Sequence, residues 1–191
     1  MARLREFDEA AAVSAIEAIF WEKGYEGTSY ADLTDATGLG KGSLYAAFGN
    51  KKSLYIKALE NYIMREVNAL GGVMLQRFAD DPTKWRDCLK DFLNIAIEAV
   101  KDRQDRRGCF LCNAAVDLAP YDKDVEATVM QALGEVKSAL SSIIEKNVTK
   151  NKREGMVEYI LAVYLGMRVM AKAGATPEQL TLARDTTIAS F

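Results

Sequence analysis

Histidine is absent from this 191-residue sequence, and proline and cysteine occur only three times each. The lack of histidine excludes the chemistry that depends on an imidazole, which covers most zinc and copper sites and much acid–base catalysis. Three prolines leave long uninterrupted segments, which favours helices over a strand-and-turn fold. Three cysteines are too few for a disulfide framework, so they indicate a protein of the reducing cytoplasm.

Long apolar segments are absent as well. No stretch reaches the roughly 18 apolar residues of a membrane span, and no basic leader with an apolar run opens the chain. Hydrophobic residues make up 49% of the sequence and charged residues 27%, the mix of an ordinary globular protein. We therefore expect a cytoplasmic protein without a membrane partner, a metal site or a cofactor.

Helical spacing of apolar residues runs through most of the chain, and we find no convincing strand, internal repeat or low-complexity tract. Glycines, prolines and hydroxyl residues mark the ends of the periodic segments. The sequence thus predicts an all-α fold of about nine helices, with a small N-terminal part and a larger C-terminal bundle. The expected helices cover residues 8–23, 30–37, 41–48, 51 onward, 82–101, 109–118, 121–146, 154–173 and 177 onward.

The stretch GLGKGSLYAAFGNKKSLY, residues 38–55, combines glycines, aromatics and lysines. No carboxylate occurs among residues 41–57, which hold four lysines. Two short helices joined by a tight turn at Gly38 form a helix-turn-helix, whose second helix typically enters the DNA major groove. Free amides at the start of that helix and of the next can meet backbone phosphates. The stretch therefore predicts a DNA-reading surface.

The longer segment GTSYADLTDATGLGKGSLYAAFGNKKSLY resembles the TetR-type family of bacterial transcriptional repressors. The similarity covers roughly residues 8–60. The positions that match the family pattern are Gly27, Thr28, Leu33, Gly38, Leu39, Gly42, Ser43, Leu44, Tyr45, Phe48, Lys51 and Leu54. Thr34 and Thr37 depart mildly from it, and Ala47 replaces a more usual histidine or tyrosine, which removes one frequent DNA contact.

This resemblance implies a helix-turn-helix DNA-binding domain over residues 1–50, joined by the start of the linking helix to about residue 55, and an effector-binding and dimerisation domain over residues 51–191. It implies a homodimeric repressor, not an enzyme, that binds a palindromic operator and is released by a small-molecule effector. Activation in place of repression stays open. The implied DNA-contacting residues are Thr28, Tyr30, Lys41, Gly42, Ser43, Tyr45 and Lys51.

Charge distribution decides whether this module suits DNA. Residues 1–60 hold 7 Lys/Arg and 9 Asp/Glu, a net charge of −2. DNA binding then requires the four lysines of residues 41–57 to lie near the DNA face, aided by Arg3 and Arg5, while the acids turn away. The acids concerned are Glu6, Asp8, Glu9 and Glu17. The alternative is a buried three-helix cap with a solvated lysine face.

The C-terminal part offers a pairing surface and a pocket. Residues 159–171 form a helix that is apolar on most of its circumference, which requires cover on several sides. We expect a twin subunit to supply it, against the alternative of a core helix in a monomer. The predicted interface residues are Tyr159, Val163, Gly166, Met167 and Met170. The residues predicted to line the ligand pocket, or alternatively to form plain core, are Phe78, Trp85, Phe92, Phe110, Asn113, Val116 and Met130.

Cys109 and Cys112 lie three residues apart, on one face of a predicted helix and just after Arg103, Arg106 and Arg107. A helix start and nearby positive charge lower a thiol pKa, so Cys109 could react with oxidants or electrophiles and Cys112 could resolve the product. The alternatives are two structural thiols, or a dithiol oxidoreductase.

The enzyme interpretation fails for want of a histidine relay and of a thioredoxin-like βαβ context. A metal site built on the two thiols alone would be incomplete. A pure scaffold protein would leave residues 38–55 unexplained.

Overall fold

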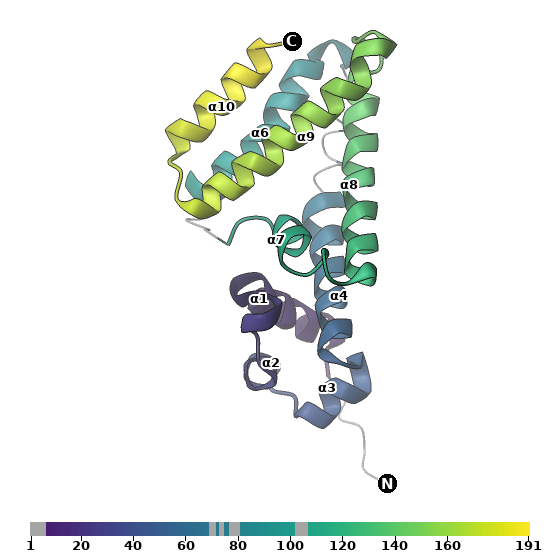
Figure 1. Cartoon of the computed structure of the whole chain (residues 1–191), viewed down its shortest axis with the longest axis vertical. Helices are drawn as coiled ribbons and strands as arrows, with labels where there is room; N and C mark the ends of the chain where they lie inside the picture. Colours follow the sequence, from purple (N-terminus) through teal and green to yellow (C-terminus); the bar gives the residue numbers. More distant parts are fainter. Residues whose placement is uncertain (1–6, 69–71, 73–74, 77–80, 102–106) are drawn as a thin grey trace.

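The structure is a computed structural model that describes residues 7–68, 72, 75–76, 81–101 and 107–191. Within these residues it is all-α, as predicted, and contains no strand (Figure 1). The α-helices are α1 (Glu9–Gly27), α2 (Tyr30–Thr37), α3 (Lys41–Phe48), α4 (Lys51–Tyr62), α6 (Trp85–Lys101), α7 (Phe110–Asp117), α8 (Lys123–Ile144), α9 (Lys150–Ala173) and α10 (Pro177–Ala189). A π-helical turn, Ile63–Asn68, extends α4, and a 3-10 turn, Pro82–Lys84, precedes α6.

The first helix is longer than its sequence predicts. Gly24 adopts a left-handed φ of 72°, as expected of a terminating glycine, but helical structure resumes beyond it to Gly27. The result is a kinked α1, because only glycine enters this region of φ without strain. The second and third helices have the predicted bounds.

Local signals fix α2 at both ends. At its start, the Ser29 hydroxyl accepts from the Asp32 amide and the Asp32 carboxylate accepts from the Ser29 amide, a reciprocal capping box. At its end, Gly38 takes a left-handed φ of 66°. This glycine turns the chain sharply into α3, so the helix-turn-helix geometry follows directly from the sequence.

Two clusters of buried side chains hold the chain together. The first includes Phe20 of α1, Leu33 of α2, Leu44 of α3 and Tyr55 of α4, but it continues into α7 and α8 through residues such as Phe110. The second is formed by α6, α8, α9 and α10. The N-terminal helices therefore share a core with part of the C-terminal bundle.

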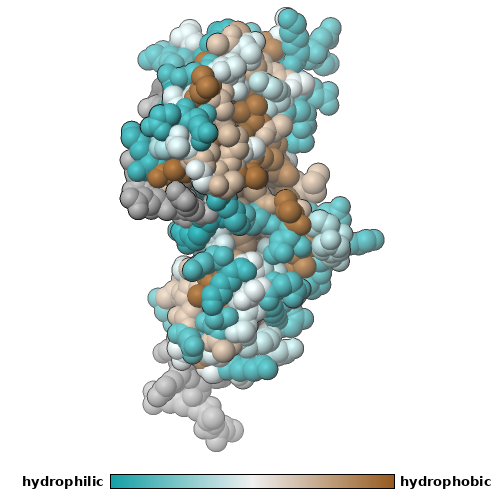
Figure 2. All heavy atoms as spheres, turned by 60° about the vertical axis from the view of Figure 1, so that its left-hand side comes forward, coloured by the Kyte–Doolittle hydropathy of each residue, from teal (hydrophilic) through white to brown (hydrophobic). Residues whose placement is uncertain are grey.

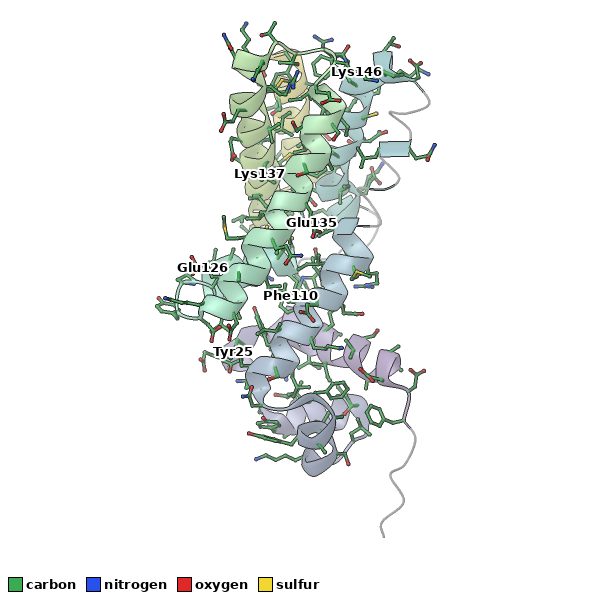
Figure 3. All side chains as sticks on the ribbon, turned by 90° about the vertical axis from the view of Figure 1, so that its right-hand side faces the viewer. Tyr25, Phe110, Glu126, Glu135, Lys137 and Lys146 are labelled. Atoms are coloured by element: carbon green, nitrogen blue, oxygen red, sulfur yellow. The ribbon has the colours of Figure 1, made fainter. Side chains whose placement is uncertain are left out.

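The elements follow this division in space. The three N-terminal helices occupy one end of the molecule, α6, α9 and α10 occupy the other, and α7 lies between them beside α4 and α8 (Figure 1). Figure 3 shows Phe110 of α7 at this junction, above Tyr25 and below Glu135. No helix among the described residues is both long and apolar enough to span a membrane.

Candidate DNA-binding surface and internal cavity

Helix α3 presents nearly its whole circumference to solvent. Leu44 is its one fully buried side chain and anchors the helix in the first core. Lys41, Gly42, Ser43 and Tyr45 are exposed, and the Tyr45 side chain has 53% of its area accessible. Gly40 precedes the helix without a side-chain cap, so the first amides stay open to an anion.

Three of the predicted DNA contacts form one cluster across α2 and α3. The rings of Tyr30 and Tyr45 are stacked, with centroids 6.3 Å apart and an interplanar angle of 25°. The Lys41 ammonium lies 4.8 Å from the centroid of the Tyr30 ring, within the range of a cation–π interaction. The stacking and the lysine contact hold two hydroxyls and one positive charge close together at the exposed end of the N-terminal unit.

Lys51 lies at the first position of α4. Its ammonium sits 4.5 Å from the centroid of the Tyr25 ring, and the preceding Asn50 caps the helix by accepting from the Ser53 amide at 2.9 Å. A cation beside the start of a helix suits a backbone phosphate, because the helix dipole and the ammonium attract it together.

Thr28 differs from its prediction. Its side chain is buried, and its hydroxyl donates to the carbonyl oxygen of Gly24 at 2.7 Å. The hydroxyl therefore stabilises the kinked end of α1 and is not available to a phosphate, so this residue is withdrawn from the DNA contacts.

Two lysines expected near the DNA face are engaged elsewhere. Lys52 pairs with Asp122 at 3.1 Å and Asp124 at 2.8 Å, at the start of α8, and Lys57 lies 3.7 Å from Glu9. Lys41 and Lys51 instead lie over the rings of Tyr30 and Tyr25. Arg3, Arg5 and Glu6 lie outside the described residues.

The acids explain how a module of net negative charge can still serve DNA. Asp8 caps α1, and Asp32 pairs with Lys23 at 2.6 Å inside the α2 capping box. Glu17 is buried, where it accepts from Asn61 at 2.6 Å and pairs with Arg65. These carboxylates are used in caps and ion pairs, and α3 itself carries no acidic residue.

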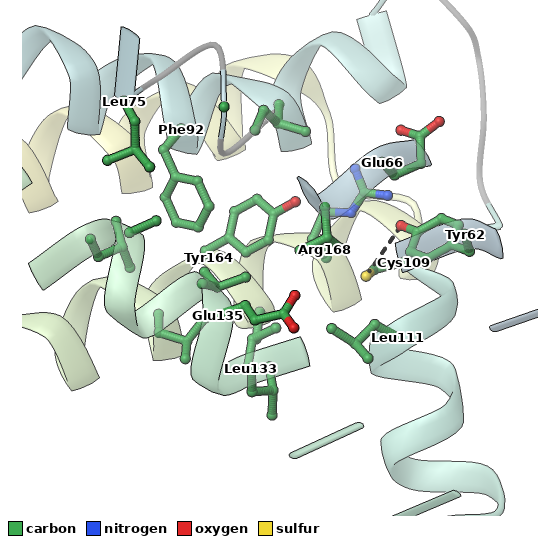
Figure 4. A pocket seen from close by; sticks show the side chains of 18 residues that line it. Tyr62, Glu66, Leu75, Phe92, Cys109, Leu111, Leu133, Glu135, Tyr164 and Arg168 are labelled. Carbon is green, nitrogen blue, oxygen red and sulfur yellow. Dashed lines mark hydrogen bonds between the residues drawn. The ribbon is translucent and has the colours of Figure 1, made fainter. Parts of the chain in front are cut away.

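The C-terminal bundle contains a partly open cavity of about 330 Å³ (Figure 4). Its apolar walls come from α6, α8 and α9 and include Phe92, Ile95, Leu133, Val136, Leu161 and Leu165. Its polar lining is supplied by Tyr62, Glu66, Cys109, Glu135, Tyr164 and Arg168. Apolar walls with a few converging polar groups are the usual composition of a small-molecule site.

Of the seven residues predicted to line a ligand pocket, Phe92 lines this cavity. Trp85 and Phe110 are buried in the second and first cores, respectively. Asn113 and Val116 border a separate hollow beside α1, and Met130 is exposed on α8. Phe78 lies outside the described residues. The spacing of aromatics thus identified core positions more often than cavity positions.

The polar lining was missed by the sequence analysis. One signal could have revealed it: Arg168 stands inside the apolar segment 159–171, and its side chain is nevertheless buried. One terminal nitrogen of its guanidinium donates to the carbonyl oxygen of Gly108 at 2.6 Å. Burial raises the pKa of Tyr62 and Tyr164, which keeps both neighbouring hydroxyls protonated.

Cys109 lies at this cavity, whereas Cys112 borders the separate hollow beside α1. Cys109 is the N-cap of α7, lines the cavity and accepts from the Tyr62 hydroxyl at 3.4 Å. A hydrogen bond from the Cys112 thiol lowers the pKa of Cys109 to about 6 against the effect of burial, with help from the Arg168 charge and the Tyr62 hydroxyl. The same contact raises the pKa of Cys112.

The charges near Cys109 are not the ones that the sequence suggested. Arg107 stacks on Trp21, its guanidinium carbon 3.9 Å from the ring centroid, and Arg103 and Arg106 lie outside the described residues. Arg168 from α9 acts on the thiol instead.

An apolar face runs along α9. Tyr159, Gly166 and Met170 are exposed and lie at a spacing that places them on one side of the helix. Val163 is half-buried, whereas Met167 is packed into the second core, so Met167 is corrected from an interface residue to a core residue. In the view of Figure 2, which brings the α9–α10 side forward, apolar atoms gather along the middle of the upper half.

These observations define a class: a helix-turn-helix DNA-binding regulator with a cavity-bearing helical bundle. The family model "Bacterial regulatory proteins, tetR family" matches residues 12–58, and the model "Tetracyclin repressor-like, C-terminal domain" matches residues 86–187. The chain belongs to the tetR family of bacterial regulatory proteins, and it is a DNA-binding transcriptional regulator.

Individual relatives agree with this assignment. The transcriptional repressor ComR of Escherichia coli (strain K12) is 27% identical over 192 residues, covering 97% of this chain and 90% of ComR. The uncharacterized regulator YezE of Bacillus subtilis (strain 168) is 28% identical over 125 residues, and the match spans 65% of this chain and 62% of YezE. A solved structure of a cysteine mutant of the TetR family regulator CifR, complexed with 26-bp operator DNA, superposes with a TM-score of 0.85 at 25% identity, covering 99% of this chain and 100% of that one.

Proposed function

We propose that the protein is a homodimeric repressor that binds a palindromic operator through α3 and is released when a small molecule enters the bundle cavity. The observation that carries this proposal is the presence in one chain of an exposed helix α3 and a cavity in the C-terminal bundle. The protein acts by binding and not by catalysis, at DNA in the cytoplasm.

In this proposal, α3 lies in the major groove of the operator. Ser43, on the exposed first turn, reaches base edges, while Lys41 and the hydroxyls of Tyr30 and Tyr45 meet phosphates that flank the groove. Gly42 lets the backbone approach the DNA closely. Lys51 and the open amides at the start of α4 hold a further phosphate.

Two subunits are required to read a palindrome. The exposed face of α9, with Tyr159, Gly166 and Met170, pairs with its twin about a two-fold axis, and Val163 adds apolar area at its edge. The two α3 helices then lie about one DNA turn apart, roughly 34–36 Å.

The path from cavity to DNA passes through α7. Cys109 and Leu111 line the cavity, while Phe110, between them in sequence, contacts the rings of Tyr55 and Tyr62 with centroids 5.3 and 5.9 Å away. At the other end of α7, Asp117 accepts from the Tyr25 amide at 3.0 Å. A shift of α7 therefore acts on α1 and α4 together. The effector releases DNA only if it prefers the shifted state.

A second candidate trigger is favoured by one observation, the lowered pKa of Cys109 at the cavity wall. Alkylation of this thiolate by an apolar electrophile, or oxidation to a disulfide with Cys112 by a peroxide, would displace α7 in the same way. The two candidates separate when operator binding is measured for Cys109→Ser, which retains release by a non-covalent effector and loses release by electrophiles.

Operator selection tests the proposal as a whole. The protein is mixed with DNA fragments from upstream of its gene, and the bound fragments are footprinted. Sedimentation of the complexes then gives the number of protein chains on each fragment. We expect an inverted repeat occupied by an even number of chains. A footprint without symmetry, occupied by one chain, would refute the dimeric reading of DNA.

A further inference from the structure

Arg168 brings a positive charge into the apolar interior of the bundle. It lies in the C-terminal third of α9, the residue is only 6% exposed, and its guanidinium reaches the cavity (Figure 4). A buried charge is strongly unfavourable unless it is paired and hydrogen-bonded, so the partners of this side chain need a full accounting.

That accounting leaves the guanidinium incompletely satisfied. One terminal nitrogen donates to the Gly108 carbonyl oxygen at 2.6 Å, but Nε is buried without any hydrogen-bond partner. Among the residues that the structure describes, no carboxylate forms an ion pair with Arg168. A neutral carbonyl satisfies a donor without neutralising the charge.

The two carboxylates of the cavity lining are occupied elsewhere. Glu66 lies 3.6 Å from Arg65 on the adjoining π-helical turn, and Glu135 is exposed and accepts from Gln131 at 3.2 Å. Neither forms an ion pair with Arg168, so the Cys109 thiolate is the one negative charge described beside the guanidinium, and a ligand anion would compete with it. Both carboxylates also disfavour a ligand with more than one negative charge, because like charges repel strongly in an apolar site.

The surroundings of Arg168 are suited to a ligand with one polar end. The Tyr164 hydroxyl points toward the guanidinium in Figure 4, and the Tyr164 ring packs against Phe92 with centroids 4.3 Å apart. Beyond this pair the walls are aliphatic, with Leu161, Leu165 and Val136. An aliphatic or aromatic body would bury its apolar area there.

We propose that the cavity binds an apolar organic monoanion whose single carboxylate pairs with Arg168 and accepts a hydrogen bond from Tyr164. This inference names the chemical class of the effector, and so it rests on the proposed function. The guanidinium fork can offer two N–H donors to a carboxylate and attracts its charge, whereas a neutral ligand gains only the hydrogen bonds.

Calorimetric titration with three probes of equal chain length tests the inference. Octanoate carries the anion, octanamide is its neutral analogue and octylamine carries the opposite charge. We expect wild-type protein to bind octanoate at least about tenfold more tightly than octanamide, and to bind octylamine not at all.

Variants assign the preference to Arg168. Arg168→Gln should lose the preference for octanoate, and Arg168→Lys should keep part of it. Lys172→Gln is the matched control, because it removes one positive charge from the same helix at a side chain that binds Asn113 outside the cavity. Tyr164→Phe should weaken octanoate binding several-fold and serves if Arg168 variants do not fold. Cys109→Ala removes the thiolate that competes for Arg168 and should leave octanoate binding intact or tighter.

Three results would overturn the inference: equal affinity for octanoate and octanamide, tighter binding of octylamine, or no octanoate binding by wild-type protein. Operator binding is measured separately on the same preparations. Protein that binds operator but not octanoate refutes this inference alone, whereas protein that binds no operator refutes the proposed function whatever the probes show.

Discussion

Single residues of α3 carry the contacts expected with DNA. Lys41 lies over Tyr30 and its ammonium is exposed, so Lys41→Ala should remove one phosphate contact without disturbing the core. We expect weaker operator binding at every sequence tested and a salt slope reduced by about one. The measurement is operator affinity as a function of salt concentration, with Lys150→Ala, an exposed lysine at the start of α9, as the control. An unchanged slope would remove Lys41 from the interface.

The Cys109 thiol offers a pH-dependent prediction. Its pKa of about 6 in the folded protein lies below the value of about 8.5 for an unfolded cysteine. The thiolate thus stabilises the folded state fully above about pH 8.5, and this stabilisation is lost as the pH falls through about 6. Thiolate absorbance measured against pH, with the Cys109→Ser signal subtracted, should show the titration.

Cys112→Ala should raise the pKa of Cys109, because it removes the hydrogen bond that lowers this pKa most. An unchanged pKa would mean that Cys112 does not donate to Cys109.

At the scale of residues, the sequence predicted the surface better than the interior. Exposed Lys41, Ser43 and Tyr45 stand in a local motif whose geometry depends on a few neighbouring residues. The buried hydroxyl of Thr28 depends on the kink at Gly24, which the sequence alone does not reveal. Arg168 stands out in sequence as a charge inside an apolar segment, but its partner, the Gly108 carbonyl before α7, lies 60 residues away and is not indicated by any local pattern.

Among the elements, α2 depends on its capping box. Ser29→Ala removes the acceptor for the Asp32 amide and should destabilise the protein by about 1 kcal/mol. The adjacent Asp32 adds a pH dependence, because hydrogen bonds from Lys23 and Ser29 lower its pKa. Its contribution to stability is fully present above the ordinary carboxyl pKa and is lost as the pH falls from that value toward the lowered pKa of the folded state. Chemical denaturation of wild type and Ser29→Ala checks the cap. Equal stabilities would show that the box is not formed.

Helix α7 is the joint between the cavity and the N-terminal unit. Phe110 is fully buried between Tyr55 and Tyr62, so Phe110→Ala should cost about 3–5 kcal/mol of unfolding free energy. If α7 transmits the effector signal, a folded Phe110→Leu variant should bind both effector and operator. Its operator affinity should then change only weakly when the effector is added. A full response in that variant would place the coupling elsewhere.

Most helix bounds could be predicted because glycines and caps mark them in the sequence. The core that the N-terminal helices share with α7 and α8 could not be predicted in this way. The sequence predicts a domain boundary near residue 50, yet Phe110 and Val125 pack in the same cluster as Phe20 and Leu33. Contacts between segments this distant in sequence come from packing and not from periodicity.

On the scale of the whole molecule, reading a palindrome depends on dimer formation. Met170 is exposed on the apolar face of α9, so Met170→Asp should place a charge in the interface, dissociate the dimer and weaken operator binding. Sedimentation of the free protein measures the first effect and anisotropy the second. Met130→Asp, the same substitution at an exposed methionine of α8, should change neither. If Met170→Asp and Met130→Asp had the same oligomeric state and operator affinity, the apolar face of α9 would not be the dimer interface.

The most direct test of DNA binding through α3 is a fluorescence-anisotropy titration of operator DNA at one fixed salt concentration. Wild-type protein is compared with a Lys41→Ala, Tyr45→Phe double variant whose helical content and melting are unchanged. We predict that the double variant loses at least about tenfold in affinity, since a hydrogen bond or ion contact to a phosphate contributes about 1.5 kcal/mol or more. A double variant with full wild-type affinity would show that α3 does not face the DNA.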